Sequence, residues 1–271
     1  MQPAFPLRRP TVGLLRVTKL NKADLLRLLQ KEILCLMVCE AVDAEAARHI
    51  VGQITGSEHL VGYEVEPRFL KIGHAWFDHS TDQDRANHVA RTVQYTDETR
   101  ALCAPFPVPT ETFKLDLDLL WQPGANNLRI NGDPIYFGMP RALPPGGAVD
   151  AHFDWIGADS PGANGIEQVQ RQYAVNVYLQ TAESGGELAL WDTQLSPDDL
   201  KVLRIPGHAY ALDEAKLGKP DLVVKPEAGS LVFFDATQPH AVRRAEGSRP
   251  RVTFSAFMGF SGPERPLSLW S

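Results

Sequence analysis

Residues 229–260 read GSLVFFDATQPHAVRRAEGSRPRVTFSAFMGF, and this stretch of the chain decides the fold class. The runs 230–234 and 252–260 are rich in β-branched and aromatic residues, which favour β-strands. Between them, Pro239, Glu246-Gly247 and Pro250 interrupt regular structure. The stretch therefore predicts two strands that are separated by turns.

Runs of the same character precede this stretch, and glycine- and proline-rich turn signals separate them. The turns at 144–147 (PPGG) and 184–186 (SGG) are examples. The strands expected here are 135–138, 173–179, 187–191 and 222–225. Several short strands joined by turns in this way are typical of a β-sandwich or barrel.

The first hundred residues have a mixed α and β pattern. Asn21 and Asp43 are expected to cap two helices, because short polar side chains accept bonds from the free N–H groups at helix starts. The other elements expected before the barrel are strands at 12–17 and 33–38 and helical stretches at 82–103 and 110–121. We predict a single domain, residues 1–271, in which a helical N-terminal part packs on a C-terminal β-barrel, with the boundary near 110–125.

Composition excludes several classes of protein. The chain has 271 residues, of which 44% are apolar and 22% charged, and its formal net charge is −6, which argues against binding to nucleic acid. The three cysteines, at positions 35, 39 and 103, form no disulfide framework and no CxxC pair. No apolar run approaches the ~18 residues that span a membrane. We expect a cytoplasmic protein that binds neither nucleic acid nor membranes.

One of the eight histidines is followed two residues later by a carboxylate, in His152-Phe153-Asp154. Residues i and i+2 of a strand share a face, so both side chains can reach one metal ion. His240, just after the predicted strand 230–234, is the candidate for a third ligand. Two histidines and one carboxylate leave three octahedral positions open, which suits non-haem Fe(II). Taken alone, the His-x-Asp pattern fits a structural histidine better, because such histidines are common on strands.

A candidate carboxylate receptor follows the third ligand. Arg251 lies 11 residues after His240 and two before Thr253. On a strand these two side chains share one face with Ser255, and a guanidinium beside a hydroxyl group suits a carboxylate. The alternative for Arg251 is a surface position in a basic turn, and Arg249 is the second candidate for the receptor.

Taken in order, these motifs resemble the Fe(II)/2-oxoglutarate-dependent oxygenases over roughly residues 130–262. The motifs are His152-Phe-Asp154, Ser184-Gly-Gly-Glu-Leu188, Gly229-Ser-Leu-Val-Phe-Phe234, Pro239-His240 and Arg251-Val-Thr253. The second and third are similar to those of prolyl-hydroxylase-like members. The C-terminal part, through Phe257-Met-Gly-Phe260, resembles free-standing hydroxylases and halogenases that modify natural products.

This resemblance implies an α+β fold, with a double-stranded β-helix (a jelly-roll, cupin-like barrel) over residues 121–271 and flanking helices in residues 1–120. It implies that His152, Asp154 and His240 are the catalytic Fe(II) ligands, with O₂ and 2-oxoglutarate as co-substrates. By the same resemblance, Arg251 pairs with the distal carboxylate of 2-oxoglutarate, and Thr253 is its hydrogen-bonding neighbour.

The resemblance also bears on the reaction. Asn176 and Tyr178 are candidates for co-substrate contacts, although they fit ordinary strand residues equally well. Halogenases of this superfamily have Gly or Ala where the carboxylate ligand stands, and this chain has Asp154. Hydroxylation or another oxidation is therefore expected, with release of succinate and CO₂.

The expected substrate is a small molecule, such as an amino-acid derivative or a natural-product intermediate, oxidised at an unactivated C–H bond. Candidate substrate contacts are Phe153, Trp155, Trp191 and Tyr136, although most aromatic residues belong to cores. The connections 156–171 and 192–221 are long for hairpins, and we expect them to form a lid.

Three alternatives remain open from the sequence. One is a hydroxylase of protein or peptide side chains from the same superfamily. Another is a non-oxygenase barrel that uses the same ligands for a different divalent metal, although such a site needs no buried receptor for a carboxylate. The third, a catalytically inactive scaffold, fits poorly with the retained ligands. The oligomeric state is open as well, with a homodimer as one arrangement.

Overall fold

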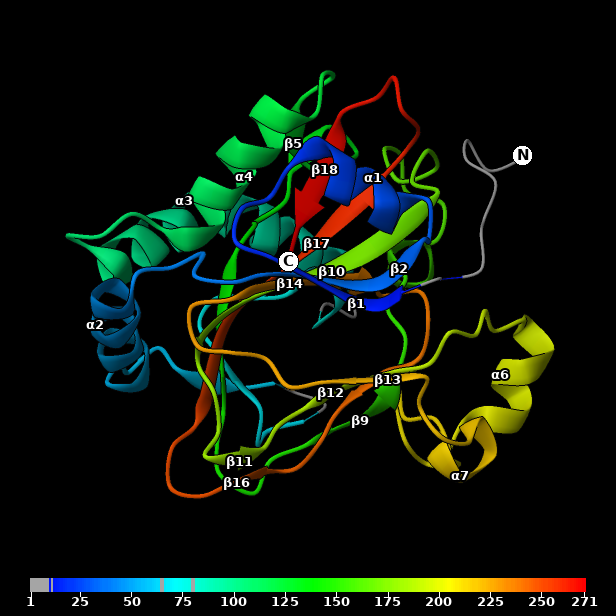
Figure 1. Cartoon of the computed structure of the whole chain (residues 1–271). Coiled ribbons are helices and arrows are strands. Elements are labelled where there is room, and N and C mark those ends of the chain that lie inside the picture. The colour runs from blue at the N-terminus through cyan, green and yellow to red at the C-terminus, as the bar shows by residue number, and fades with distance from the viewer. Residues whose placement is uncertain (1–9, 11, 64–65, 79–80) are drawn as a thin grey trace.

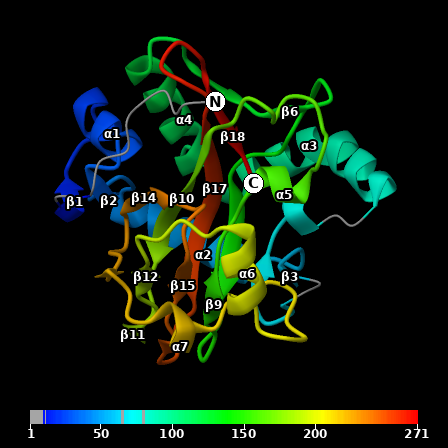
Figure 2. The same ribbon diagram turned by 90° about the vertical axis from the view of Figure 1, so that its right-hand side faces the viewer.

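Two β-sheets lie opposite each other in the computed structural model, which describes residues 10, 12–63, 66–78 and 81–271. Helices lie on the outer side of the larger sheet, and the smaller sheet lies below it in the view of Figure 1. Figure 2 shows the same arrangement from the side, with α6 and α7 over the end of the barrel. The two sheets with flanking helices confirm the predicted α+β barrel.

The larger sheet contains the long strands that build one wall of the site. In spatial order its strands are β1 (Val12–Val17), β2 (Ile33–Val38), β14 (Leu231–Asp235), β10 (Arg171–Gln180), β17 (Arg251–Phe260), β8 (Met139–Leu143), β4 (Leu70–Lys71) and β3 (Val61–Gly62). β18 (Leu267–Trp270) pairs with β17 and with β5 (Ala125–Asn127). β1 and β2 come from the N-terminal part of the chain, and β2 pairs with β14.

Strand alternation separates the two faces of this sheet. On β10, Val175 and Val177 belong to the outer hydrophobic cluster, whereas Asn176 lines a cavity between the sheets and Tyr178 packs in the inner cluster. β17 pairs with β10 along nearly its whole length and alternates in the same way, so Arg251 also lines that cavity. The polar residues of both strands therefore meet on the inner face.

The smaller sheet forms the opposite wall. Its order is β13 (Leu222–Val224), β12 (Leu188–Leu190), β15 (His240–Val242) and β9 (Val149–His152). Two short pairs complete the β-structure: β11 (Ser184–Gly185) with β16 (Ala245–Glu246), and β6 (Arg129–Ile130) with β7 (Asp133–Pro134).

Four longer helices precede the smaller sheet in the chain: α1 (Lys22–Leu29), α2 (Ala44–Thr55), α3 (Asp82–Cys103) and α4 (Pro109–Leu120). The predicted caps are confirmed, since Asn21 accepts a bond from the N–H of Asp24 at 3.0 Å and Asp43 from that of Glu45 at 2.7 Å. One hydrophobic cluster joins residues of α1, α2 and α4 to the outer face of the larger sheet. This shared cluster supports the single-domain assignment, which stays a prediction.

The connections expected to form a lid contain short helices. These are α5 (Ile156–Asp159) in the first connection and α6 (Pro197–Leu203) and α7 (Glu214–Leu217) in the second. A short 3₁₀ helix, η1 (Trp76–Asp78), packs beside α5. Among the described residues, no helix has the length and apolar character needed to cross a membrane.

The prediction of a strand at 135–138 is wrong. This segment joins β7 to β8 without ladder pairing, and its last residue, Gly138, has a φ of +90°. A Cβ atom at Gly138 would lie 2.2 Å from Oγ1 of Thr110 on α4. Ile135 and Tyr136 are buried in the interior and Phe137 is partly buried, so tertiary packing rather than strand propensity sets the conformation of this segment.

Candidate metal and co-substrate site

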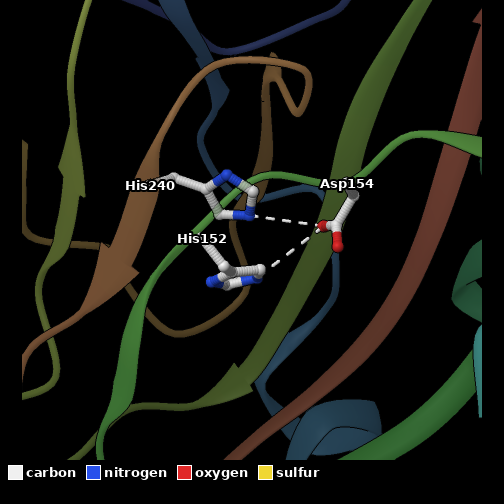
Figure 3. A group of neighbouring side chains, drawn as sticks. All are labelled: His152, Asp154 and His240. Carbon is white, nitrogen blue, oxygen red and sulfur yellow. Dashed lines mark ion pairs between the residues drawn. The ribbon is translucent and has the colours of Figure 1, made fainter. Parts of the chain in front are cut away.

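The three candidate metal ligands come together at one end of the smaller sheet (Figure 3). His152 is the last residue of β9 and His240 the first of β15, and the two are partners in the ladder. Asp154 lies just beyond the end of β9, where its backbone N–H donates to the carbonyl of Ala236 at 2.8 Å. This backbone bond, rather than a shared strand face, holds Asp154 beside His152.

The geometry of the three side chains fits one metal ion. Each side chain offers a ligand atom, and these atoms all lie within 4.8 Å of one another. Nε2 of His240 is 3.4 Å and Nε2 of His152 is 3.8 Å from Oδ2 of Asp154. The two imidazole rings have centroids 4.2 Å apart. Such a set of two nitrogen atoms and one carboxylate suits Fe(II) with open positions.

Backbone carbonyls orient both imidazole rings. Nδ1 of His152 lies 2.8 Å from the carbonyl oxygen of Asp150, and Nδ1 of His240 lies 3.0 Å from that of Gln238. A carbonyl only accepts, so Nδ1 carries the proton in both rings and donates it. In the neutral form of each ring Nε2 is then the nitrogen without a proton, and it faces Asp154, which is the arrangement that metal-binding histidines need.

The surroundings of His152 and Asp154 favour the protonation states that bind a cation. Burial lowers the pKa of His152 to about 4, and the neighbouring His240 acts in the same direction. Burial alone would raise the pKa of Asp154, but the two imidazoles and Arg141 outweigh it and hold the pKa below its usual value. At neutral pH the site thus contains a neutral imidazole at His152 and a carboxylate, as metal binding requires.

The predicted receptor for the co-substrate lies in the same cavity. Arg251, Asn176 and the three candidate ligands line one cavity between the two sheets. Nη2 of Arg251 donates to the hydroxyl of Tyr178 at 3.0 Å, and the guanidinium carbon lies 4.8 Å from the centre of that ring. Nε of Arg251 is buried without a hydrogen-bond partner. A buried guanidinium with an unused donor fits a bound carboxylate, such as the distal one of 2-oxoglutarate.

The structure places the remaining co-substrate candidates at different distances from this cavity. Asn176 lines it directly, opposite Ser255 in the β10–β17 ladder. Thr253 is the ladder partner of Tyr178, and its hydroxyl lies 3.3 Å from that of Ser255. Thr253 therefore stands beside the Arg251–Tyr178 pair, and Ser255 is a cavity-lining hydroxyl.

A second, outer cavity of ≈ 320 Å³ adjoins the first. Phe153 and Trp155, two of the predicted substrate contacts, line it. Residues of both expected lid connections line it too, namely Ala158, Asp159, Arg204, Ala209 and Tyr210. Asp154, His152 and Arg141 border both cavities, so the outer cavity opens directly onto the candidate metal site.

Two predicted substrate contacts lie away from both cavities. Trp191 is buried at the end of β12, and its indole N–H donates to the carbonyl of Gly218 at 2.9 Å. Tyr136 is buried in a separate cluster, with its hydroxyl 2.6 Å from that of Thr99. The structure brings neither side chain to the candidate site.

The sequence analysis did not identify two residues that lie close to the candidate metal site. The ring of Tyr210 packs edge-on against His152, with centroids 5.6 Å apart. Arg141, in the middle of β8, lines both cavities. Its only sequence signal is a charged residue inside an otherwise apolar short run, which does not indicate a ligand.

A metal site beside a buried arginine, between the sheets of a double-stranded β-helix, characterises the Fe(II)/2-oxoglutarate-dependent oxygenases. Comparison of this chain with known proteins leads to the same class. The sequence model of the family described as carrier-protein-independent halogenase WelO5 matches residues 130–271, which is just over half of the chain. The chain belongs to this family and is an Fe(II)- and 2-oxoglutarate-dependent oxygenase, as its motifs predicted.

A curated protein and several solved structures are similar to this chain. An L-gamma-glutamyl-L-propargylglycine hydroxylase from Streptantibioticus cattleyicolor is 26% identical over 194 residues, which are 70% of this chain and 68% of that protein. Two solved structures of an N-substituted L-amino acid dioxygenase from Burkholderia ambifaria, one of them in complex with alpha-KG, are 15% identical. They cover 92% of this chain and 90% and 91% of theirs, with TM-scores of 0.58 and 0.60. At this identity the structures show a shared fold.

Proposed function

We propose that this oxygenase hydroxylates an unactivated C–H bond of a small amino-acid derivative, while 2-oxoglutarate is converted to succinate and CO₂. The observation that carries the proposal is the single cavity that contains His152, Asp154 and His240 together with the buried Arg251. A metal site and a carboxylate receptor are both required by this reaction, and other uses of a metal barrel do not need the second.

Each group in the cavity has a separate task. His152, Asp154 and His240 would hold Fe(II) and leave three positions open. Arg251, steadied by Tyr178, would bind and orient the distal carboxylate of 2-oxoglutarate. When bound, Fe(II), 2-oxoglutarate and O₂ supply the oxidising chemistry.

Apolar side chains line much of the wall of the inner cavity. Leu188 and Val242 of the smaller sheet and Phe234 and Ala174 of the larger one line it. Side chains of this kind offer no hydrogen bonds, so polar groups bound between them interact strongly with the fixed charges of the site. Arg251 and the metal ligands therefore act in a largely apolar surrounding.

The proposed substrate class rests on the outer cavity and on a relative. A volume of ≈ 320 Å³ matches a small molecule. The Streptantibioticus relative is named for its action on a γ-glutamyl amino acid. A small amino-acid derivative is consistent with both, and a folded protein substrate would have to enter between the segments 156–171 and 192–221.

We propose hydroxylation rather than halogenation, although the family is described by a halogenase. Asp154 stands beside both histidines with its carboxylate among the ligand atoms. In this chain the third ligand position is therefore filled by protein oxygen, and no room is left there for a halide.

We also propose that the enzyme works in the cytoplasm. Cys35 and Cys103 are buried free thiols, and Cys39 is also unpaired. Free thiols are typical of a reducing compartment, which also keeps iron in its Fe(II) state.

The test uses the metal-free protein under anaerobic conditions. Addition of Fe(II) together with 2-oxoglutarate is expected to produce the visible charge-transfer band of the chelate, and neither component alone should do so. The band should be absent in His240→Ala and present in His208→Ala, which changes an exposed histidine of the second lid segment. A band that persists in His240→Ala would contradict the assigned ligands, and succinate release with candidate amino-acid derivatives then tests the substrate class.

A further inference from the structure

Arg141 lies beside the candidate metal site, but the proposed reaction assigns no role to it. It lies at the centre of β8, between β4 and β17, with Lys71 and Thr253 as its ladder partners. Its side chain lines both the inner cavity with the metal ligands and the outer cavity of ≈ 320 Å³. The guanidinium therefore stands where a molecule bound in the outer cavity meets the candidate metal site.

Three aromatic rings surround this guanidinium. Its central carbon lies 5.5 Å from the ring centre of Tyr63, 5.7 Å from that of Phe69 and 5.8 Å from that of Phe77. Tyr63 and Phe77 stack on each other, with centres 5.9 Å apart and planes 3° apart. Contacts of this kind hold a cation in place but do not neutralise its charge.

The guanidinium of Arg141 forms no ion pair with a described residue, although its charge acts on the more distant carboxylate of Asp154. Nε of Arg141 is buried without a hydrogen-bond partner. The neighbouring cation on β4 shows the contrast, because Lys71 is buried in an ion pair with Asp78. Of these two adjacent cations, Lys71 has a counter-ion and Arg141 has none within the part of the chain that the structure describes.

Binding of Fe(II) and 2-oxoglutarate does not supply a counter-ion for Arg141 either. The charges of Fe(II), Asp154, the 2-oxoglutarate dianion and Arg251 cancel one another, so among these groups the positive charge of Arg141 is uncompensated. Glu66 and Asp159 also line the outer cavity, but Glu66 pairs with Arg68 and neither carboxyl group forms an ion pair with Arg141. A partly buried cation near a metal ion is unfavourable unless an anion is bound beside it. The outer cavity, where the substrate is expected, has room for such an anion beside Arg141.

We propose that Arg141, held by Tyr63, Phe69 and Phe77, binds a carboxylate of the substrate. This inference rests on the proposed function and narrows it, because the substrate must then be a small carboxylic acid such as an N-acyl amino acid with a free carboxylate. A fork of two N–H donors fixes the orientation of a carboxylate as well as its position. Arg141 would thus select which C–H bond of the substrate faces the metal.

The test measures binding rather than turnover. The protein is loaded with Mn(II) and 2-oxoglutarate without oxygen, and calorimetry compares N-acyl amino acids with their primary amides: hippurate with hippuramide, N-acetyl-L-leucine with N-acetyl-L-leucinamide, and γ-glutamyl-L-valine with its C-terminal amide. We expect at least one acid to bind about tenfold to a hundredfold more tightly than its amide, the range of a lost charge-assisted hydrogen bond. Arg141→Gln should reduce the preference to within about twofold and leave the affinity for 2-oxoglutarate within about threefold.

Further variants separate a binding role from a structural one. Arg141→Lys keeps the charge without the fork, so it should retain part of the preference, and it replaces Arg141→Gln if that variant does not fold. Arg129→Gln, at an exposed position of β6, should behave like the unmodified protein.

Three results would overturn the inference. The first is equal binding of acids and amides, and the second is binding of none of the acids. The third is a loss of 2-oxoglutarate affinity in Arg141→Gln, which would place Arg141 in the co-substrate site. A missing Fe(II)–2-oxoglutarate band in the unmodified protein would instead contradict the proposed function itself.

Discussion

At the scale of single residues, Tyr178 is the most direct support of the co-substrate receptor. Its hydroxyl accepts a bond from Nη2 of Arg251 at 3.0 Å, and its ring packs against the same guanidinium. Tyr178→Phe removes the bond and keeps the ring, so Arg251 loses orientation but not its charge. We expect the KM for 2-oxoglutarate to rise about threefold to tenfold, with little change in kcat, because the lost bond acts on the co-substrate only through the orientation of Arg251 and is worth about 1 kcal/mol.

The comparison variant for this prediction is Arg251→Gln, which removes the charge itself and should raise the same KM by a much larger factor. Steady-state kinetics at saturating substrate measure both. An unchanged KM in Tyr178→Phe would show that Arg251 is oriented without the hydroxyl group.

Asp159 gives the structure a pH-dependent stability. Burial raises the pKa of this carboxyl to about 7, and the charge of Asp154 acts in the same direction, while Arg85 opposes it. Because the folded pKa lies above the ordinary value of 3.8, the folded protein binds more protons than the unfolded chain from about pH 4 to 7. Stability therefore falls as pH rises through this window and levels off above it.

Urea unfolding of the metal-free protein at pH 6 and pH 8 tests this point. From pH 6 to pH 8 the free energy of unfolding should fall by about 1 kcal/mol more in the unmodified protein than in Asp159→Asn, because most of the Asp159 titration falls in this interval. Asp198→Asn, whose side chain is 88% exposed, should match the unmodified protein. An equal change in the free energy of unfolding between pH 6 and pH 8 for the unmodified protein and Asp159→Asn would contradict the raised pKa.

The residues that the sequence predicted as metal ligands and co-substrate receptor share a recognisable order. His152, Asp154, His240 and Arg251 are separated by motifs that a sequence displays directly, and the structure brings them into one cavity. Arg141 has no such partner along the chain, because its rings and its neighbouring cation come from the segment 61–78, far away in sequence. The role of Arg141 is inferred from the lack of an ion-pair partner among the described residues, and only the three-dimensional structure shows this.

At the scale of secondary-structure elements, α6 is stabilised by a local cap and precedes a segment that lines the outer cavity. Ser196 and Asp199 form a reciprocal cap at its start, in which Oγ of Ser196 accepts from the N–H of Asp199 at 3.2 Å. The segment that follows supplies Arg204 and Tyr210 to the cavity wall. Only Leu203 of α6 is fully buried, so the cap is a large part of what holds this short helix.

Ser196→Ala should therefore loosen the lid and leave the barrel intact. Loss of such a cap costs about 1 kcal/mol, which corresponds to roughly fivefold faster hydrogen exchange in α6. Exchange in β10 and the melting temperature should stay unchanged. Ser184→Ala, an exposed serine at β11, is the matched control, and equal protection of α6 in both variants would contradict the role of the cap.

Elements were predictable where their signals are local. The caps at Asn21 and Asp43 set the starts of α1 and α2, and strand-favouring runs gave β10 and β17 within two residues. The run 135–138 has the same composition but no neighbouring strand, because pairing depends on partners elsewhere in the chain. Local propensity cannot supply that information.

At the scale of the whole molecule, the N-terminal part completes the barrel instead of standing beside it. β2 pairs with β14 and covers an edge of the sheet that residues 121–271 would otherwise expose. On the outer face, Phe113 of α4 meets Phe233 of β14 edge to face, with ring centres 5.2 Å apart. The sequence predicted strands at 12–17 and 33–38, but which strand they join is a long-range property that no local pattern encodes.

This shared core predicts that the two parts unfold together. Phe113→Ala removes a side chain that is 3% exposed, so it should cost about 3–4 kcal/mol and lower the melting temperature by roughly 5 °C. Calorimetry should show one transition before and after the change, with far-ultraviolet and tryptophan signals moving together. Leu115→Ala, on the same helix at a residue that is 58% exposed, should shift the transition by less than about 1 °C. Two separate transitions, of which only one responds to Phe113→Ala, would show that residues 1–120 fold as an independent unit.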